Sequence, residues 1–366
     1  MPENPDHYAV VIGIDKYTQF RRLPSAVKDA TTFAEWLTSC DGGGLRKKNT
    51  HLIVSEEVTE KELKANVVSS PFKAIPLQTE IDEALAKIGV QSKSRIGSRL
   101  YFYFAGHGFG PNFQDIGMLM ANAAMERLNS NVGLNPYRHF FRDWGFFDEV
   151  IFILDCCRDE FVTVTQTTGP TFTLGQISGP RPQVNDFIVM AAPHGEKAFD
   201  AADERQVRRG LLTQALLKAF TDSEAADPLG RITAASLQAY ITKSVPKLAG
   251  NVIDPKTKQP LKQEPEVDPP QKEIVFGNLP PGAVEKLMVR IIAPPGMDGF
   301  IELRGSDFSL IRSRRAVDVT IEKPPWEERL IRQKWYALTN SDSPPGTPPI
   351  IIDLREVKND PHVITL

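Results

Sequence analysis

Four short runs of almost continuous apolar residues are the most regular feature of this chain. Strands that are covered on both faces of a sheet have this pattern, whereas half-exposed strands alternate between apolar and polar residues. Small or turn-forming residues bound each run. The four runs are YAVVIGI at 8–14, LYFYFAG at 100–106, VIFILD at 150–155 and FIVMAA at 187–192.

Between these runs and after the last one, apolar residues recur every three or four positions, as along a helix with one buried face. Strands that alternate with helices need crossover connections, so we predict an α/β fold with a mostly parallel central sheet between helices. Catalytic and binding residues of such folds gather beyond the carboxyl ends of the strands. The helical segments are SAVKDATTFAEWL (25–37), TEIDEALAKIG (79–89), GLLTQALLKAF (210–220) and TAASLQAYITKSV (233–245).

The periodicity ends at residue 245, and we predict three regions. Residues 1–245 form the α/β domain. Residues 246–283 hold eight prolines among many charged residues, which predicts a linker or extended strap. Residues 284–366 form a small all-β domain of unknown role. Its expected strands, separated by Pro/Gly turns, are KLMVRIIAP, GFIELRG, AVDVTIEK, KWYALTN and IIIDLREV.

Composition and charge narrow the class of protein. The 366 residues are 41% hydrophobic and 24% charged, as in soluble globular proteins, and the net charge of −3 gives no support for a nucleic-acid partner. The start of the chain lacks the pattern of a secretory signal, and no apolar run reaches the roughly 18 residues of a membrane span. We therefore expect a cytoplasmic protein without a membrane partner. Three cysteines are too few for a disulfide framework.

Two of the four apolar runs end on residues that can together perform thiol chemistry. The run at 100–106 leads into His107, which is flanked by glycines, and the run at 150–155 leads into Cys157. If these strands end at the same edge of the sheet, the imidazole can take the thiol proton and later protonate a leaving amine. The backbone amides of Gly108 and Cys157 are candidates for holding the oxyanion.

Other residues compete for these roles. Cys156 is the rival nucleophile, but neighbouring side chains of a strand face opposite ways, so only one of the two cysteines can face the site. His194 also ends a predicted strand and is an alternative base, although it lacks the Gly-His-Gly setting. Arg158 is either a substrate contact or a surface cation. No Walker-type phosphate loop and no zinc-binding spacing of His and Cys is present, so the sequence requires no cofactor and names no metal ligand.

These motifs resemble the caspase-like cysteine peptidases, most closely the metacaspase branch with its prokaryotic relatives. In that family a strand ending in GHG is followed about 50 residues later by a strand ending in Asp-x-Cys. LPSAVKDA at 23–30 is similar to the family's Leu-x-Gly-Ala/Cys-x-x-Asp-Ala, with Ser25 in place of the usual glycine. The resemblance covers residues 6–245. It implies a caspase-like α/β/α sandwich with a large-subunit-like part (1–162), a loop (163–186) and a small-subunit-like part (187–245).

The resemblance also implies a specificity. The family's acids at the positions of Asp29 and Asp155 line the pocket for the residue before the scissile bond and select Arg or Lys. Two carboxylates that face a guanidinium make strong charge-assisted contacts. Caspases, which select Asp, have Gln at the position of Asp155. Self-cleavage after a basic residue would then use sites in or after the loop, and the candidates are Arg181, Arg205, Arg208 and Arg209.

The resemblance implies a cysteine endopeptidase that is activated by a signal or by self-processing and acts in regulated cell death or antiviral defence. Its expected partners are proteins with Arg or Lys before the scissile bond, among them a pore-forming effector. Many metacaspases need calcium, for which this sequence locates no site. The β domain is expected to bind a regulator or a substrate. The alternatives are a catalytically silent caspase-like scaffold and another thiol enzyme, such as a transferase or esterase.

Overall fold

The computed structural model divides the chain into two compact units. The first comprises Met1–Lys218 with Gln238–Ile274, and the second Ala219–Leu237 with Val275–Leu366. No described helix combines the length and the apolar composition that a membrane crossing requires. The structure describes residues 4–55, 74–92, 94–124, 128–159, 166–174, 183–227, 229–279, 286–306, 308–332, 334–344, 346–355, 357 and 361–366.

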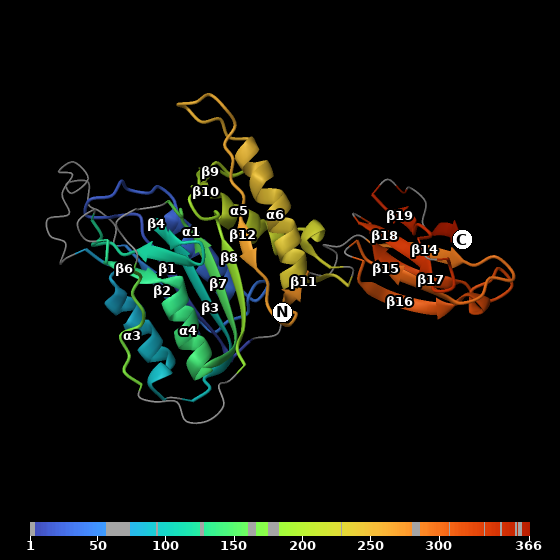
Figure 1. Ribbon diagram of the computed structural model, residues 1–366, viewed down its shortest axis with the longest axis horizontal. Helices are drawn as coiled ribbons and strands as arrows, with labels where there is room; N and C mark the ends of the chain where they lie inside the picture. The colour runs from blue at the N-terminus through green and yellow to red at the C-terminus, as the bar shows by residue number, and fades with distance from the viewer. Residues whose placement is uncertain are drawn as a thin grey trace. The chain divides into compact units, whose positions relative to one another are not determined.

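A six-stranded sheet forms the centre of the first unit, with the strand order β12-β8-β7-β3-β1-β2 (Figure 1). Its first five strands in chain order are parallel, and β12 pairs antiparallel with β8. The four apolar runs of the sequence are four neighbouring strands of this sheet, and the predicted α/β fold with a mostly parallel sheet is confirmed. The strands are β1 (His7–Gly13), β2 (Thr50–Val54), β3 (Gly97–Ala105), β7 (Phe147–Asp155), β8 (Asn185–Met190) and β12 (Glu266–Asp268).

Successive side chains of a strand point to opposite faces of the sheet. Because these strands are almost continuously apolar, both faces are hydrophobic, and helices cover both. On one face the ring of Phe33 in α1 stacks on Tyr103 of β3, and the Tyr103 hydroxyl bonds to Thr213 of α5 at 2.6 Å. On the other face Phe102 packs against Tyr137 of α4, and α3 joins the same core cluster. The helices are α1 (Ala26–Thr38), α3 (Gln78–Ile88), α4 (Leu134–Trp144), α5 (Leu211–Ala219) and α6 (Ala234–Gly250).

Two small antiparallel sheets follow the carboxyl ends of β3 and β8 in the sequence. One begins directly after His107, and the other is a hairpin that leads into α5. The first consists of β4 (Gly108–Asn112), β5 (Asp115–Leu119) and β6 (Asn131–Gly133), and the hairpin of β9 (Asp200–Ala202) and β10 (Arg208–Gly210).

The Pro-rich segment after residue 245 contains more regular structure than its composition indicates. Helix α6 continues to Gly250 with Pro246 inside it. Farther on, Gln263 is buried, donates to the Ala191 carbonyl at 3.0 Å and accepts the Phe199 N–H at 2.7 Å. Three residues later β12 joins the sheet. The segment is therefore a strap that is bonded to the first unit at several points.

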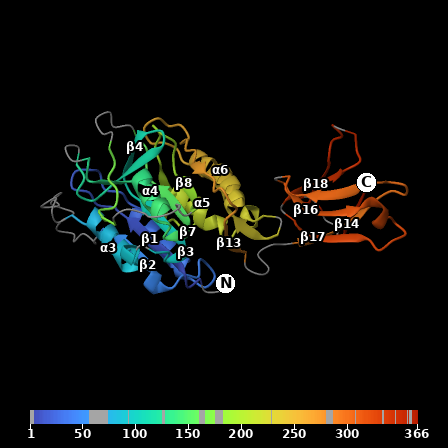
Figure 2. The same ribbon diagram turned by 60° about the horizontal axis from the view of Figure 1, so that its bottom comes forward.

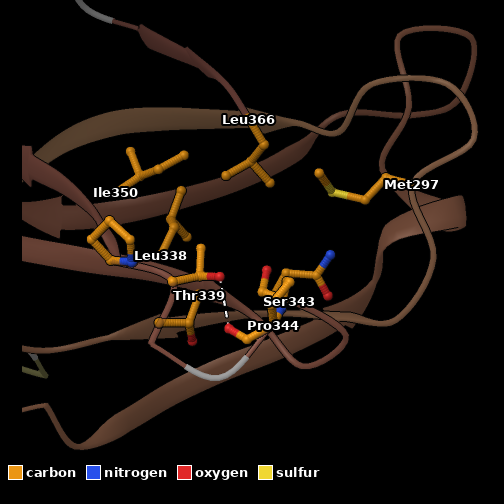
Figure 3. A pocket seen from close by; sticks show the side chains of 10 residues that line it. Met297, Leu338, Thr339, Ser343, Pro344, Ile350 and Leu366 are labelled. Carbon is orange, nitrogen blue, oxygen red and sulfur yellow. Dashed lines mark hydrogen bonds between the residues drawn. The ribbon is translucent and has the colours of Figure 1, made fainter.

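The β domain has a core of its own between two sheets, β17-β14-β20 and β16-β15-β18-β19 (Figure 2). A cavity of about 200 Å³ opens beside β18, between Leu338, Leu366 and Pro344 (Figure 3). The strands are β14 (Lys286–Ile292), β15 (Phe300–Arg304), β16 (Leu310–Arg315), β17 (Trp326–Ile331), β18 (Trp335–Asn340), β19 (Ile350–Asp353) and β20 (His362–Thr365); β11 (Arg231–Thr233) and β13 (Val275–Asn278) form a separate pair in the second unit.

Candidate active site

The register of the central sheet brings the two candidate strand ends side by side. β3 and β7 are neighbours, and Ala105 at the end of β3 lies opposite Asp155 at the end of β7. His107 and Cys157 each follow two residues after these positions. The glycine after the histidine is needed for this approach, because a Cβ at Gly108 would lie 2.6 Å from Cys156 Sγ and 2.8 Å from the Cys157 carbonyl oxygen.

Tyr17 and the backbone of Arg21 hold His107 in place. Its backbone N–H donates to the hydroxyl of Tyr17 at 2.7 Å, and the two rings lie 4.7 Å apart. Its Nε2 is 2.7 Å from the carbonyl oxygen of Arg21. Because a carbonyl only accepts, Nε2 carries the proton, and Nδ1 of the neutral ring is the basic nitrogen. Burial lowers the pKa of His107 below its usual 6.5, so the ring is neutral at pH 7.

The thiol of Cys157 is also held by backbone groups. Sγ accepts the N–H of Ala198 at 3.3 Å and lies 3.5 Å from the Ala198 carbonyl oxygen. Burial raises the pKa of Cys157 to about 11, so the resting group is a thiol. Among the described residues no hydrogen bond joins this thiol to the imidazole, and catalytic pairs often tighten only when substrate binds. Cys156, the rival nucleophile, lies in the hydrophobic core.

The two predicted pocket acids are brought together beneath these strand ends. Asp29, 1% exposed, accepts the Gly210 N–H at 2.8 Å, and its other oxygen lies 3.6 Å from Arg209. Asp155, 8% exposed, accepts the N–H and the hydroxyl of Thr213 at 3.0 and 2.6 Å. Burial and the charge of Asp155 raise the pKa of Asp29 to about 8. Burial raises the pKa of Asp155 to about 6.

The basic residues predicted as self-cleavage sites lie mainly on the β9–β10 hairpin. Arg208 donates from Nε and Nη2 to the two oxygens of Asp200, and Arg209 bonds to Asp203 at 3.2 Å. The backbone N–H of Arg205, in the turn of the hairpin, donates to Asp203. Arg181 lies outside the described residues. Cleavage at any of the four stays a prediction.

The contacts of Arg158 give it a structural role, whereas His194 as the alternative base stays a prediction. Arg158 is fully buried and bonds to Glu266 of β12 and to the Phe113 carbonyl, so it ties the segment after Cys157 to the strap and to the β4–β5 turn. It is a structural residue rather than a surface cation. His194 contacts the Gly110 carbonyl through Nε2 at 3.2 Å, and its ring packs on Phe113.

Several groups that build this site carry no sequence signal. The Arg21 carbonyl and the Ala198 amide are backbone groups, which any residue type provides. Tyr17 acts through its hydroxyl at a position outside the motifs, whereas Thr213 lies in RRGLLTQALLKAF, a segment similar to the family's Gly-x-x-Thr helix. Within the described ranges, His, Cys, Asp and Glu form no cluster of three or more that could hold a metal ion. The predicted oxyanion role of the Gly108 and Cys157 amides stays a prediction.

Comparison with known proteins gives two matches. Residues 6–270 match the family model of the caspase domain, which reaches past the predicted boundary at 245 and includes β12. A probable protease from a Desulfuromonadales bacterium is 29% identical over 219 residues, which cover 58% of this chain and 25% of that protein. The chain thus spans about a quarter of the length of this relative.

Proposed function

Because the chain belongs to the caspase-domain family of peptidases, we propose that it is a cysteine endopeptidase in which Cys157 is the nucleophile and His107 the general base. The observation that carries this proposal is the juxtaposition of the two strand ends, with Nε2 of His107 committed to the Arg21 carbonyl and Nδ1 left to accept a proton. A base of this kind is required, since burial keeps the pKa of Cys157 at about 11 and a thiol is a poor nucleophile.

In the proposed reaction the proton moves twice through His107. Sγ of Cys157 bonds to the scissile carbonyl carbon as Nδ1 takes the thiol proton, and the amides of Gly108 and Cys157 stabilise the oxyanion. Collapse of this intermediate breaks the C–N bond, and Nδ1 gives its proton to the departing amine. Water then attacks the thioester with the same nitrogen as base, which releases the acid and restores the thiol.

We propose that the substrate residue before the scissile bond is Arg or Lys. The support is electrostatic: Asp29 and Asp155 lie close enough for the charge of one to raise the pKa of the other. Buried carboxylates that repel each other are stabilised by a bound cation. A substrate guanidinium or ammonium that approaches these acids would supply it.

A peptide panel tests this function. Wild type and Cys157→Ala are compared on peptides that differ only in Arg, Lys, Asp or Leu before the scissile bond. We expect cleavage after Arg and Lys, and a loss of at least about 10³-fold in Cys157→Ala. Cys40→Ala, which removes an exposed thiol, is the matched control and should retain full activity. Activity that survives Cys157→Ala would remove the thiol mechanism, and preference for Asp would overturn the pocket assignment.

The biological setting is proposed on the family resemblance alone. It comprises activation by a signal or by self-cleavage, a role in regulated cell death or defence, and a β domain that binds a regulator or substrate.

A further inference from the structure

A third carboxylate lies beside the two predicted pocket acids, and it is the one that reaches solvent. The side chain of Asp200, the first residue of β9, is 23% exposed, whereas that of Asp29 is 2% exposed. Asp200 is close enough for its charge to contribute to the raised pKa of Asp155. The two inner acids already accept bonds from Gly210 and Thr213. An incoming cation therefore meets Asp200 first.

The segment that carries Asp200 is fixed against the nucleophile. Ala198, two residues earlier, donates its N–H to Cys157 Sγ at 3.3 Å. The next N–H, that of Phe199, donates to the buried amide of Gln263 at 2.7 Å. A substrate acyl group bonded to Cys157 must therefore lie beside this segment, and a long side chain on that acyl group comes within reach of Asp200.

A guanidinium already occupies this carboxylate. Arg208, on the partner strand β10, donates from Nε and Nη2 to the two oxygens of Asp200 at 2.6 and 3.2 Å. This is the forked geometry with which arginine binds a carboxylate most strongly. The Arg208 side chain is 54% exposed, so it can leave into solvent without disturbing a packed core.

One buried oxygen of the acid cluster, Oδ1 of Asp29, has no hydrogen-bond partner among the described residues. The nearest cation, Arg209 Nη1, is 3.6 Å from it and donates instead to the Thr32 hydroxyl. Buried polar atoms without a partner are uncommon in native proteins. A cation that approached this oxygen would favour the ionised form of Asp29 and would supply the partner that the oxygen lacks.

We infer that Asp200 is a specificity-determining residue whose carboxylate binds the substrate guanidinium. The substrate displaces the guanidinium of Arg208, which occupies that carboxylate in the absence of substrate. The inference rests on the proposed function and deepens it, because it names the contact that selects arginine. Arginine is favoured over lysine at such a carboxylate, because the planar guanidinium forms two parallel hydrogen bonds to it, whereas the ammonium of lysine is a point charge. Arg208 weakens substrate binding by competition and takes no part in the chemistry.

The test uses two peptides that differ only in arginine or citrulline before the scissile bond, since citrulline has nearly the shape of arginine without its charge. The variants are Asp200→Asn and Arg208→Gln in the full-length protein. Asp148→Asn and Arg95→Gln are the controls, because Asp148 and Arg95 form an exposed ion pair with each other.

In Asp200→Asn we expect kcat/KM for the arginine peptide to fall about 10- to 100-fold, the range for losing one charge-assisted pair, with less than about a threefold change for citrulline. In Arg208→Gln we expect the KM for arginine to fall severalfold at unchanged kcat. Asp200→Glu keeps the charge and should restore most of the selectivity. An unchanged arginine-to-citrulline ratio in Asp200→Asn, or a higher KM in Arg208→Gln, overturns the inference.

A binding measurement separates this result from failure of the proposed function. If wild type cleaves neither peptide, the endopeptidase proposal fails. Calorimetric binding of the arginine peptide to Cys157→Ala, with and without Asp200→Asn, then still tests Asp200. Weaker binding in the double variant supports the inference, and equal binding or no binding in both proteins overturns it.

Discussion

At the scale of single residues, the resting protonation of Cys157 and His107 determines how the proposed reaction would begin. Burial favours the uncharged form of both groups, because it raises the pKa of the thiol to about 11 and lowers the pKa of the imidazole. Asp155 and Asp159 add to the rise at the thiol, and Lys197 opposes it. The pair thus starts as thiol and imidazole, without a preformed thiolate–imidazolium ion pair.

Alkylation of Cys157 by iodoacetamide should therefore rise steadily with pH. In a Cys40→Ala background we expect the rate to increase about tenfold per pH unit from pH 7 to pH 10, because the thiolate is the reacting species. Mass spectrometry of the peptide that carries Cys157 gives the rate. A plateau that begins below pH 8 would instead reveal an ion pair at rest.

Tyr17 supports His107 through one hydroxyl. Tyr17→Phe leaves the His107 N–H without its acceptor in a buried setting, which typically costs about 1–3 kcal/mol. We expect a drop in unfolding free energy of this size and a fall in kcat with little change in KM. Tyr8→Phe, which alters a partly buried ring packed on Phe147, should stay within about 0.5 kcal/mol. Equal effects of the two changes would remove the positioning role.

The raised pKa of Asp29 makes stability depend on pH. An unfolded Asp loses its proton near pH 4, whereas in the folded protein burial holds the pKa of Asp29 at about 8. Between these values the native state binds more protons, so stability falls as pH rises from about 4 to 8. In Asp29→Asn this part of the slope should disappear in urea titrations at a series of pH values. An identical slope in both proteins contradicts the assignment.

Residue spacing predicted that the strand ends carrying His107 and Cys157 lie together, as the sheet register shows, because a glycine-flanked side chain at a strand end is a local pattern. It could not reveal Arg21, whose contribution is a carbonyl oxygen, or Asp200, which sits in a short hairpin without periodicity. Asp29 and Asp155 were found only through the family resemblance, since buried acids have no pattern of their own.

At the scale of elements, an ion-pair network joins α4, β8 and β12. Asp186 of β8 is 4% exposed and binds both Arg138 and Arg142 of α4, and Arg138 also reaches Asp268 of β12 at 2.9 Å. The network explains how a charged, three-residue strand holds its place at the sheet edge. It ties the strap to a helix as well as to its neighbouring strand.

Removing the central acid should loosen these elements together. In Asp186→Ala, Arg142 loses this carboxylate and Arg138 keeps only Asp268, and breaking a buried pair costs about 3–5 kcal/mol. Asp148→Ala removes an exposed partner of Arg95 and should cost less than about 1 kcal/mol. Urea unfolding measures both. A loss below 1 kcal/mol in Asp186→Ala would show that the network contributes no more than a surface pair.

The elements that were predicted correctly are those with a continuous apolar run or a clear helical stripe. β12 was missed because it is short, charged and surrounded by prolines. In the β domain the segment 316–323 was predicted as a strand, and this was wrong: Ala316–Asp318 form a 3₁₀ helix, followed by a turn. β16 (LIRSRR) was missed because it is exposed and rich in arginine, and β17 (WEERLI) because three charged residues interrupt its apolar ones, which are buried in the structure.

At the scale of the whole molecule, each unit has its own hydrophobic core. Trp326 is fully buried in the core of the β domain. Trp326→Ala should lower the stability of that core by about 3–5 kcal/mol while the alkylation rate of Cys157 stays unchanged. Calorimetry and alkylation give the two values. Ile321→Ala, at a side chain that is 74% exposed, is the control, and a matching change in Cys157 reactivity would show that the units are energetically coupled.

The antiparallel pairing of β12 with β8 also governs how copies of this chain can associate. β8 pairs with β7 on one side, and its last three residues, Ile188, Val189 and Met190, pair with β12 on the other, so this half of its outer side is covered. A second chain that extended the sheet at this margin would have to bind the three-residue β12 or displace it against the Asp268–Arg138 ion pair. Short, charged margins disfavour such additions, so the strap hinders the addition of a strand at the β8 side of the sheet.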